Sequence, residues 1–354
     1  MNLPIKILVV GCGNMGASHA RAYHKMKEFE IVGLVSRGVE SRQKLSEELG
    51  GYPDFGSYEE ALKATKPDAV SINTYPDTHV AYVKMALAAD CHVFVEKPLA
   101  NTVAEGLEIK KMVQESGKKL VIGYILRVHP AWTKFIEIAK TLGKPLVMRM
   151  NLNQQSHGDT WETHKNLMQS MSPIVDCGVH YVDVMCLMTG AKPVSVSAIG
   201  ARLTEELVPG MYNYGQLQVR FNDGSVGWYE AGWGPMISET AFFVKDVIGP
   251  KGCVSIMDKG PGGSDDIDSH STTNSLLLHH GETKSDGNFA KTDQIINTND
   301  EPDHQGLCDL EQEFFLKSIV ENADLIGHLD DAINSLRIVL AADESFKTGQ
   351  TVML

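Results

Sequence analysis

Short apolar runs and amphipathic segments alternate through the first 125 residues, and no other feature of the chain constrains its fold as strongly. The apolar runs are residues 5–10, 30–36, 68–72, 91–95 and 119–123. Segments with the period of a helix lie between them, at residues 17–26, 39–49, 57–64, 77–89 and 102–116. Strands that alternate with such helices form a parallel sheet through right-handed crossovers. The pattern therefore predicts a doubly wound α/β domain over residues 1–125.

A glycine motif connects the first strand to the first helix, where Gly11, Gly13 and Gly16 complete G-x-G-x-x-G. In a Rossmann domain these glycines make the tight turn, admit the pyrophosphate of a dinucleotide and let the helix pack on the strand. The start of the helix adds amide donors and a partial positive charge. We therefore expect a dinucleotide at Gly11, Gly13, Asn14, Met15 and Gly16. An ordinary glycine-rich turn is the alternative.

The end of the second strand distinguishes NAD(H) from NADP(H). A domain that binds NAD places a carboxylate there, about 20 residues beyond the glycines, to accept from the ribose 2′-hydroxyl. In this chain the count reaches Ser36, followed by Arg37 and, one helical turn later, by Arg42. A hydroxyl and a guanidinium suit a 2′-phosphate instead. The sequence favours NADP(H), and NAD(H) stays open because an arginine at a strand end can simply be solvated.

Beyond residue 125 the alternation stops, and a second domain is expected over residues 126–354. Helical periods cover residues 130–142, 172–188, 305–322 and 329–347. Runs typical of strands cover residues 145–152, 193–202, 212–221, 224–233, 239–248 and 252–257. We predict an α+β domain with an open, mostly antiparallel sheet, whose final helices can pack back on the first domain. Residues 258–304 carry no sustained period, which predicts a long excursion that serves as a lid or a subunit contact.

Glu96, Lys97 and Pro98 follow a buried strand directly. A charged pair costs free energy in an interior, and a proline cannot extend the strand pairing. Open α/β sheets bind their ligands outside the carboxyl ends of the strands, so a ligand site explains this placement. Tyr75 and Pro76 end the preceding strand, and we expect Pro76 beside a ribose of the cofactor.

The helical segment 172–188 carries a polar stripe. Asp176, His180, Asp183 and Leu187 recur along it at helical spacing, while its other faces are apolar. A helix that is apolar nearly all round is buried, so this stripe must face a polar partner or a cleft. The alternative to a functional site is a structural pair of histidine and aspartate.

Four motifs of this chain occur in the order and spacing of one enzyme family. They are G-x-G-x-x-G at 11–16, Glu96-Lys97-Pro98, Gly123-Tyr124-x-x-Arg127-x-x-Pro130 and Asp176-x-Gly178-x-His180-x-x-Asp183. Over essentially its whole length the chain resembles the glucose–fructose oxidoreductase / inositol dehydrogenase / rhizopine-catabolism (Gfo/Idh/MocA) family. It departs from many relatives at Ser172-Pro173, where they carry a glycine pair, and this alters how the helix begins.

The resemblance implies a catalytic set. Lys97, with a cis peptide before the proline that follows it, would hold the reacting oxygen between nicotinamide and substrate. Asp176 and His180 would complete the triad. His180 suits the role of acid and base because the ordinary pKa of histidine is about 6.5. Asp176 would hold and polarise the oxygen or the other two residues.

Further contacts are expected around this set. The segment NQQSHGDTWETHKN precedes the polar helix, and such rings stack on sugar C–H faces while imidazoles bind hydroxyls. The expected substrate-binding residues are Lys97, Tyr124, His129, His157, Trp161, His164, Asp176 and His180. Beyond the glycine motif, the expected cofactor-binding residues are Ser36, Arg37, Tyr75, Pro76, His79, Glu96, Lys97, Pro98 and Arg127. For each residue of the loop segment, an ordinary solvated position is the alternative. We expect no metal site.

Composition argues against several partners. The formal net charge of −13 disfavours nucleic acids and anionic membranes, which bind basic surfaces. No apolar run approaches the roughly 18 residues of a membrane span, and the N-terminus lacks the pattern of a signal peptide. The six cysteines form no C-x-x-C pair and fit a reducing cytoplasm. The exposed face of an open sheet predicts a homodimer or homotetramer.

We therefore expect a cytoplasmic NAD(P)-dependent oxidoreductase that interconverts a secondary alcohol and a ketone on a sugar, a cyclitol or a sugar-derived compound. Two alternatives stay open. Some members of the family cleave glycosides through transient oxidation by tightly held NAD, and one relative is a regulator that uses the dinucleotide as a ligand. The intact set of Lys97, Asp176 and His180 argues against a regulator, which has no need of proton-transfer groups.

Overall fold

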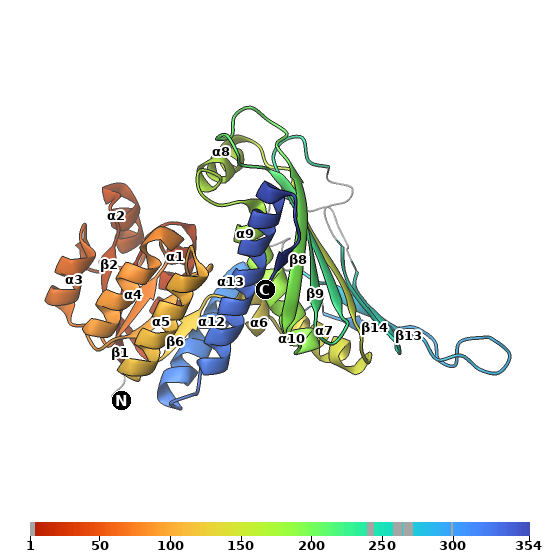
Figure 1. Cartoon of the computed structure of the whole chain (residues 1–354). Coiled ribbons are helices and arrows are strands. Elements are labelled where there is room, and N and C mark those ends of the chain that lie inside the picture. The colour runs from red at the N-terminus through yellow and green to blue at the C-terminus, as the bar shows by residue number, and fades with distance from the viewer. Residues whose placement is uncertain (1–3, 239–243, 258–263, 265–271, 299) are drawn as a thin grey trace. The chain divides into compact units, whose positions relative to one another are not determined.

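The computed structural model describes residues 4–238, 244–257, 264, 272–298 and 300–354 (Figure 1). The chain divides into two compact units. The first unit is Met1–Val128 with Gln305–Ile333, and the second is His129–His304 with Asn334–Leu354. Each unit is thus built from two separate stretches of sequence, and both draw on the long helix α13 (Ile326–Thr348).

The first unit contains a six-stranded parallel sheet with the order β3-β2-β1-β4-β5-β6. Its strands are β1 (Ile5–Val10), β2 (Phe29–Val35), β3 (Asp54–Phe55), β4 (Ala69–Ile72), β5 (His92–Val95) and β6 (Leu120–Ile122). The strand order reverses between β1 and β4, the kind of switch point at which such sheets bind ligands. The predicted doubly wound sheet is confirmed. Strand β3 was not predicted, because its two residues are too few to show a period.

Most helices of the first unit connect these strands. They are α1 (Asn14–Lys25), α2 (Val39–Glu48), α3 (Tyr58–Thr65), the 3-10 helix η1 (Pro76–Thr78), α4 (His79–Ala88) and α5 (Val103–Ser116), and two further helices, α6 (Ile125–Val128) and α12 (His304–Val320), follow the last strand. Local signals set several of their ends. Thr102 and Glu105 form a reciprocal capping box at the start of α5, and Gly117 ends it in the left-handed conformation. Ser57 caps α3 by accepting from the Glu60 N–H.

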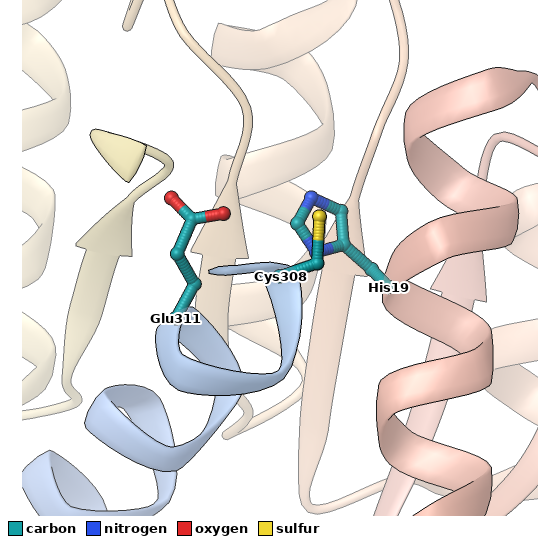
Figure 2. Close-up of side chains that lie close together, drawn as sticks. All are labelled: His19, Cys308 and Glu311. Carbon is teal, nitrogen blue, oxygen red and sulfur yellow. The ribbon is translucent and has the colours of Figure 1, made fainter. Parts of the chain in front are cut away.

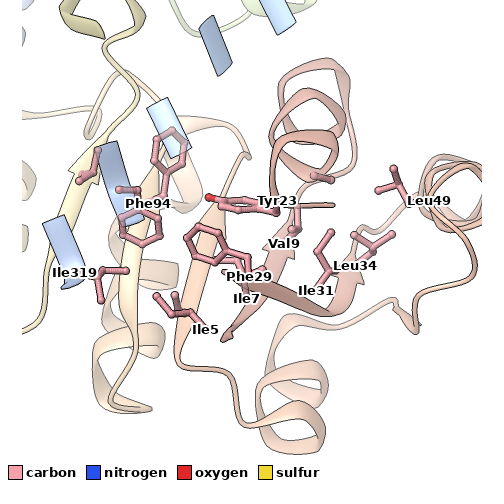
Figure 3. Close-up of a cluster of buried hydrophobic side chains, with 14 of the residues drawn as sticks. Ile5, Ile7, Val9, Tyr23, Phe29, Ile31, Leu34, Leu49, Phe94 and Ile319 are labelled. Carbon is pink, nitrogen blue, oxygen red and sulfur yellow. The ribbon is translucent and has the colours of Figure 1, made fainter. Parts of the chain in front are cut away.

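The core of the first unit joins the N-terminal strands to a helix from the far end of the sequence. Figure 3 shows Ile7 of β1, Tyr23 of α1, Phe94 of β5 and Ile319 of α12 in one buried cluster. Phe315 of α12 is fully buried, and its ring centroid lies 6.1 Å from that of Phe94. Burying such side chains contributes roughly 1.5–3 kcal/mol each. Helix α12 is therefore an integral part of this core.

The second unit contains a nine-stranded sheet with the order β14-β13-β12-β11-β7-β10-β9-β8-β15. Its strands are β7 (Val147–Gln154), β8 (Pro193–Ala201), β9 (Tyr214–Phe221), β10 (Val226–Trp233), β11 (Lys245–Gly249), β12 (Gly252–Ile256), β13 (Ser275–His280), β14 (Gln294–Asn297) and β15 (Val352–Met353). Among the described strands, β7 and β10 pair in parallel and the other neighbours pair antiparallel. The predicted open, mostly antiparallel sheet is confirmed.

Four helices and most of α13 complete the second unit. They are α7 (Pro130–Thr141), α8 (Gly158–Leu167), α9 (Pro173–Asp176) and α10 (Gly178–Thr189). Tyr181 of α10 stacks on Tyr229 of β10 with 4.9 Å between ring centroids. Gly178 allows this approach, because a Cβ there would lie 2.9 Å from the Tyr229 ring. The expectation of one continuous helix over 172–188 is wrong, since the helix breaks at Cys177.

The region 258–304 also differs from the expectation of an excursion without regular structure. Its described part contains the paired strands β13 and β14 at one edge of the sheet (Figure 1). The run Ser275–His280 groups its apolar residues together, so no period of two revealed it. Of the predicted strand 239–248, residues 239–243 lie outside the described residues. Within the described part of the chain, none of the helices is long and apolar enough to cross a membrane.

Candidate active site

The turn between β1 and α1 has room only for glycine at Gly11 and Gly16, whereas the space around Gly13 would accept a side chain. A Cβ on Gly11, whose φ is +96°, would lie 2.4 Å from Asn73 O, and a Cβ on Gly16 would lie 1.9 Å from Gly11 O. A Cβ on Gly13 would meet nothing within 4 Å. No side chain of the described residues caps α1 at Gly13. The packing of the chain therefore does not demand glycine at this position, and the open space leaves room for a ligand at the start of the helix.

The end of β2 presents Ser36 and Arg37, as predicted for the adenosine end of the cofactor. The Ser36 hydroxyl lies 3.2 Å from the Ser41 hydroxyl, and the Arg37 side chain is exposed. Arg42 is engaged locally, because its Nε donates to Asp54 Oδ1 (2.6 Å) and its Nη1 donates to Ser36 O (2.9 Å). The charge of Arg42 is thus paired within the protein, whereas the Arg37 side chain is exposed at the end of β2.

The end of β5 places Lys97 between a buried carboxylate and a cis peptide bond to Pro98. Glu96 is 6% exposed. Its Oε1 lies 2.7 Å from His19 Nε2, and its Oε2 accepts from the Lys97 backbone N–H (3.1 Å). The Lys97 side chain is half-buried. The glutamate of the motif therefore turns inward, and the lysine occupies the carboxyl end of the strand.

His79 and Tyr75, which follow β4, differ in their exposure to solvent. His79 is fully buried, with Nδ1 3.0 Å from Pro98 O and Nε2 3.0 Å from Thr74 O. Burial lowers the pKa of His79. Its ring therefore ties two strand ends together instead of presenting a free nitrogen to a ligand. Tyr75 is 57% exposed and Pro76 is buried at the start of η1.

Arg127 is anchored by the part of α13 that belongs to the first unit. Its Nη2 donates to Asp331 Oδ2 (2.9 Å), and its guanidinium lies 5.5 Å from the centroid of the buried Tyr124 ring. The neighbouring His328 accepts from the Ile122 N–H (3.0 Å). Burial, reinforced by Arg127, lowers the pKa of His328 to about 3. The motif Gly-Tyr-x-x-Arg is thus fixed at the end of β6 by contacts with residues of α13.

Asp176 and His180 stand one helical turn apart on otherwise buried helices of the second unit. Asp176 ends α9 and His180 lies in the first turn of α10, and both side chains are half-exposed. The Cys177 thiol donates to Asp176 Oδ2 (3.5 Å). Asp183, further along the same stripe, is buried and accepts from the Ser335 hydroxyl (3.1 Å). Of the polar stripe, Asp176 and His180 are therefore partly accessible, whereas Asp183 is buried and has a structural partner.

Ser172 determines how α9 begins. Its hydroxyl accepts from the Val175 N–H (3.2 Å) and donates to Asp343 Oδ1 (2.8 Å). The Tyr212 hydroxyl donates to the same carboxylate oxygen (2.5 Å). Pro173 occupies the first helical position, where its missing N–H is no loss. This N-terminal cap fixes the short helix that carries Asp176.

The predicted sugar-binding segment is divided between core and surface. Trp161 is buried in a small core with Trp233, and the Lys165 ammonium lies 5.6 Å from its ring centroid. His164 is buried, stacks on Trp233 (4.2 Å between centroids) and has Nδ1 2.9 Å from the Ser156 hydroxyl. His157 is exposed just before α8. Trp161 and His164 thus lie in the core of the unit, and of the three rings predicted to bind substrate in this segment His157 is the one exposed to solvent.

His129 caps a helix. It is fully buried, and its Nδ1 accepts from the Ala131 N–H (3.2 Å) at the start of α7. Its Nε2 lies 3.7 Å from Glu301 Oε2. The predicted role in substrate binding would need an accessible nitrogen, whereas these contacts give His129 a structural position.

Sequence reasoning missed a polar group behind Glu96. His19, Glu311 and Gln312 are all buried in the first unit. Gln312 Nε2 lies 2.8 Å from His19 Nδ1. A signal was present, because Glu311 and Gln312 fall on the face of α12 that also carries the buried Phe315. Polar residues on such a face need partners within the fold.

The sheet order, the glycine turn and the open start of α1 define a dinucleotide-binding Rossmann domain. Residues 5–124 match the family described as "Oxidoreductase family, NAD-binding Rossmann fold", and residues 136–252 match the "GFO/IDH/MocA C-terminal domain". The chain belongs to the Gfo/Idh/MocA family of oxidoreductases.

The chain is also similar to individual dehydrogenases and to solved structures of oxidoreductases. A UDP-N-acetylglucosamine 3-dehydrogenase of Acidithiobacillus ferrooxidans is 30% identical over 194 residues, which are 54% of this chain and 56% of that one. A scyllo-inositol 2-dehydrogenase (NAD(+)) of Bacillus subtilis is 25% identical over 371 aligned positions, covering 100% of this chain and 97% of that one. The crystal structure of an Agrobacterium radiobacter oxidoreductase with NAD+, L-tartaric acid and magnesium has a TM-score of 0.78 at 15% identity, covering 99% of this chain and 98% of that one.

Proposed function

We propose that this chain is an NAD(P)-dependent dehydrogenase or reductase that interconverts a secondary alcohol and a ketone on a sugar, a cyclitol or a related polyol. The observation that carries the proposal is the edge of the first sheet where β1, β4 and β5 end. The glycine turn follows β1, and Lys97 follows β5, two strands away in the sheet. Neighbouring strands are about 4.8 Å apart, so about 10 Å separates the two strand ends. A pyrophosphate at the turn would leave the nicotinamide within reach of Lys97.

The chemistry divides between cofactor and protein. A bound nicotinamide supplies the hydride acceptor or donor. Lys97 polarises the oxygen of the reacting carbon, and His180 takes the hydroxyl proton on oxidation and returns it on reduction. Asp176 orients the oxygen and the histidine. The half-exposed positions of all three side chains support these roles.

NADP(H) is our preferred dinucleotide, with NAD(H) as the alternative. The preference depends on Ser36 and Arg37, because Arg42 is already paired with Asp54. An exposed guanidinium suits a 2′-phosphate, and no carboxylate occupies the strand end to repel one. The NAD+ named for the Bacillus subtilis relative and for the Agrobacterium radiobacter structure supports the alternative.

A polyol substrate is supported by the names of the relatives, which act on a nucleotide sugar and on an inositol. We propose that His157, exposed before α8, contacts a substrate hydroxyl. We further propose that Tyr124 lines the substrate site.

We also propose that the enzyme works in the cytoplasm as a homodimer or homotetramer. The six cysteines are all free thiols, which suits a reducing compartment. The open sheet of the second unit offers a face for self-association. The net charge of −13 does not favour a nucleic-acid partner.

The first experiment is a fluorescence titration of the purified protein with NADPH and NADH. Absorbance at the nicotinamide band is then followed across a panel of sugars, inositols, uronic acids and nucleotide sugars. We expect tighter binding of NADPH and turnover of one polyol class. Turnover should fall at least about 100-fold in Lys97→Ala and His180→Ala, since positioned acid–base groups contribute about that much or more.

Lys111→Ala is the matched control for Lys97→Ala, because Lys111 is an exposed lysine of α5 that should not affect turnover. Dinucleotide binding without net turnover would instead favour the glycosidase or the regulator. Failure to bind either dinucleotide would refute the proposal.

A further inference from the structure

A chain of directional hydrogen bonds lies behind the strand end that carries Lys97. The Tyr23 hydroxyl donates to Gln312 Oε1 (2.5 Å), and Gln312 Nε2 donates to His19 Nδ1 (2.8 Å). His19 Nε2 faces Glu96 Oε1 (2.7 Å), and Glu96 Oε2 accepts from the Lys97 backbone N–H (3.1 Å). These residues all belong to the first unit, and Tyr23, His19 and Gln312 are completely or almost completely buried.

The order of donors and acceptors sets the tautomer of the imidazole. An amide nitrogen can only donate, so Nδ1 of His19 must accept. The ring proton then sits on Nε2 and points at Glu96, whose two oxygens both accept, as in an ionised carboxylate. In the observed orientation the Tyr23 hydroxyl, which burial keeps protonated by raising its pKa, donates to Gln312 Oε1 and so supports the amide with its nitrogen toward the ring.

Glu311 and Cys308 of α12 lie against the same histidine (Figure 2). One ligand atom from each of His19, Cys308 and Glu311 lies within 4.8 Å of the others, a composition that resembles a metal site. Both nitrogens of His19 are engaged, however, so a metal would have to displace Gln312 or Glu96. Burial, with the Glu96 charge adding to it, raises the pKa of Glu311 well above its usual range. Glu311 is therefore a neutral acid, and the negative charge of the group resides on Glu96.

We propose that Gln312 is a positioning residue for Lys97. It holds His19 as the Nε2–H tautomer and thereby keeps Glu96 ionised against the backbone of Lys97. The inference rests on the proposed function, in which Lys97 polarises the reacting oxygen. A fixed carboxylate beside a lysine stabilises the ammonium and the conformation of the strand end. Helix α12 then contributes to the position of Lys97 through Gln312, in addition to its place in the hydrophobic core.

Gln312→Glu tests the chain in kinetics. The substitution keeps the shape of the side chain and an acceptor for Tyr23, but removes the donor to Nδ1. A carboxylate at position 312 accepts from Nδ1, so Nδ1 gains a proton and the ring becomes either the Nδ1–H tautomer or an imidazolium between two carboxylates. Either form changes the hydrogen-bond partner or the charge that Glu96 faces. We expect kcat to fall about 10-fold or more while KM for the dinucleotide changes less than about 3-fold.

Gln114→Glu is the matched control, because it makes the same charge change at an exposed position of α5 in the same unit. Its kinetics should equal those of the wild type.

The tautomer of His19 can be measured by NMR, independently of any enzymatic activity. Two-bond proton–nitrogen correlation spectra of the full chain with nitrogen-15 histidine report which ring nitrogen carries the proton. His19 is assigned by the loss of its signals in His19→Asn. We expect a ring proton on Nε2 alone in the wild type and a proton on Nδ1 in Gln312→Glu. Tyr23→Phe, which frees the Gln312 amide to turn over, should show both tautomers.

Several results would overturn the inference. A wild-type His19 protonated on Nδ1 would do so, whatever the kinetics show. An unchanged kcat in Gln312→Glu, together with a proton on Nδ1 of His19, would do so as well. Stoichiometric zinc binding that displaces the ring proton would show a metal site instead. If the wild type turns over none of the substrates, the proposed function fails, and the tautomer measurement still decides the hydrogen-bond chain.

Discussion

Replacing Gly13 with alanine separates the needs of the fold from those of the ligand. The backbone at Gly13 is extended, with φ −78° and ψ −168°, which any residue adopts. The added Cβ would find nothing within 4 Å, so the substitution introduces no clash in the protein. Gly16→Ala is the contrasting change, because its Cβ would lie 1.9 Å from the backbone oxygen of Gly11. The first variant should fold normally, and the second should not.

The expected magnitudes follow from these distances. In Gly13→Ala, the smaller freedom of the unfolded chain contributes about 0.4–1 kcal/mol to stability. The poorer helix cap costs a similar amount, so the free energy of unfolding should change by less than about 1 kcal/mol. The methyl group would occupy the space at the start of α1 into which the pyrophosphate is proposed to fit. Losing one hydrogen bond to a charged group costs about 1.5–3 kcal/mol, and each 1.4 kcal/mol is about tenfold in affinity. We therefore expect roughly 10- to 100-fold weaker dinucleotide binding.

The assay is a fluorescence titration with NADPH and NADH, paired with urea denaturation of the same samples. Wild-type stability with weakened binding is the expected result for Gly13→Ala. Wild-type affinity in this variant would refute the placement of the pyrophosphate at the glycine turn. A large loss of stability in Gly13→Ala would contradict the open space around that position.

Three other predictions concern cofactor choice, a helix cap and pH. Ser36→Asp should weaken NADPH binding at least about 10-fold and favour NADH, because a carboxylate repels the 2′-phosphate; titrations with both dinucleotides measure this. Ser172→Ala should lower the free energy of unfolding by about 1–3 kcal/mol in urea, because it removes both a cap and a donor to the Asp343 carboxylate. His328, whose folded pKa of about 3 lies below the unfolded value, favours unfolding as pH falls below about 6.5. His328→Asn should therefore reduce the loss of stability between pH 7 and 4.5 by about 3 kcal/mol.

Each of these has a control and a result that contradicts it. Ser36→Ala removes the hydroxyl without adding charge, so an equal switch toward NADH in Ser36→Ala would refute the electrostatic argument. Ser57→Ala removes a more exposed helix cap and should cost less than Ser172→Ala. An equal loss of stability between pH 7 and 4.5 in the wild type and in His328→Asn would contradict the role of burial.

The sequence predicted most of the first sheet and the glycine turn, and the reason is local. A buried strand of a parallel sheet needs a nearly continuous apolar run, and the helix that follows needs a 3.6-residue period. The tasks of Gly11 and Gly16 depend on neighbours in the same turn and the adjacent strand end. The strands β13 and β14 escaped prediction because their apolar residues do not alternate.

The roles of the aromatic and imidazole side chains were less predictable. Trp161 and His164 were expected at a sugar, and the structure buries them against Trp233. His129 and His79 follow strand ends, as expected, yet their rings turn inward to backbone partners. Composition and spacing indicate which residues lie near a strand end, but the direction of each side chain depends on long-range packing.

The local pattern along the chain, periods of hydrophobicity and glycines at fixed spacing, was enough to establish a dinucleotide-binding domain and the strand end that bears Lys97. Contacts between residues far apart in sequence supplied the rest. Gln312 lies 293 positions from His19, and their hydrogen bond exists because α12 returns to the core of the first unit. No local pattern reports such a pairing, since it arises when hydrophobic burial brings distant segments together and the buried polar groups must then find partners.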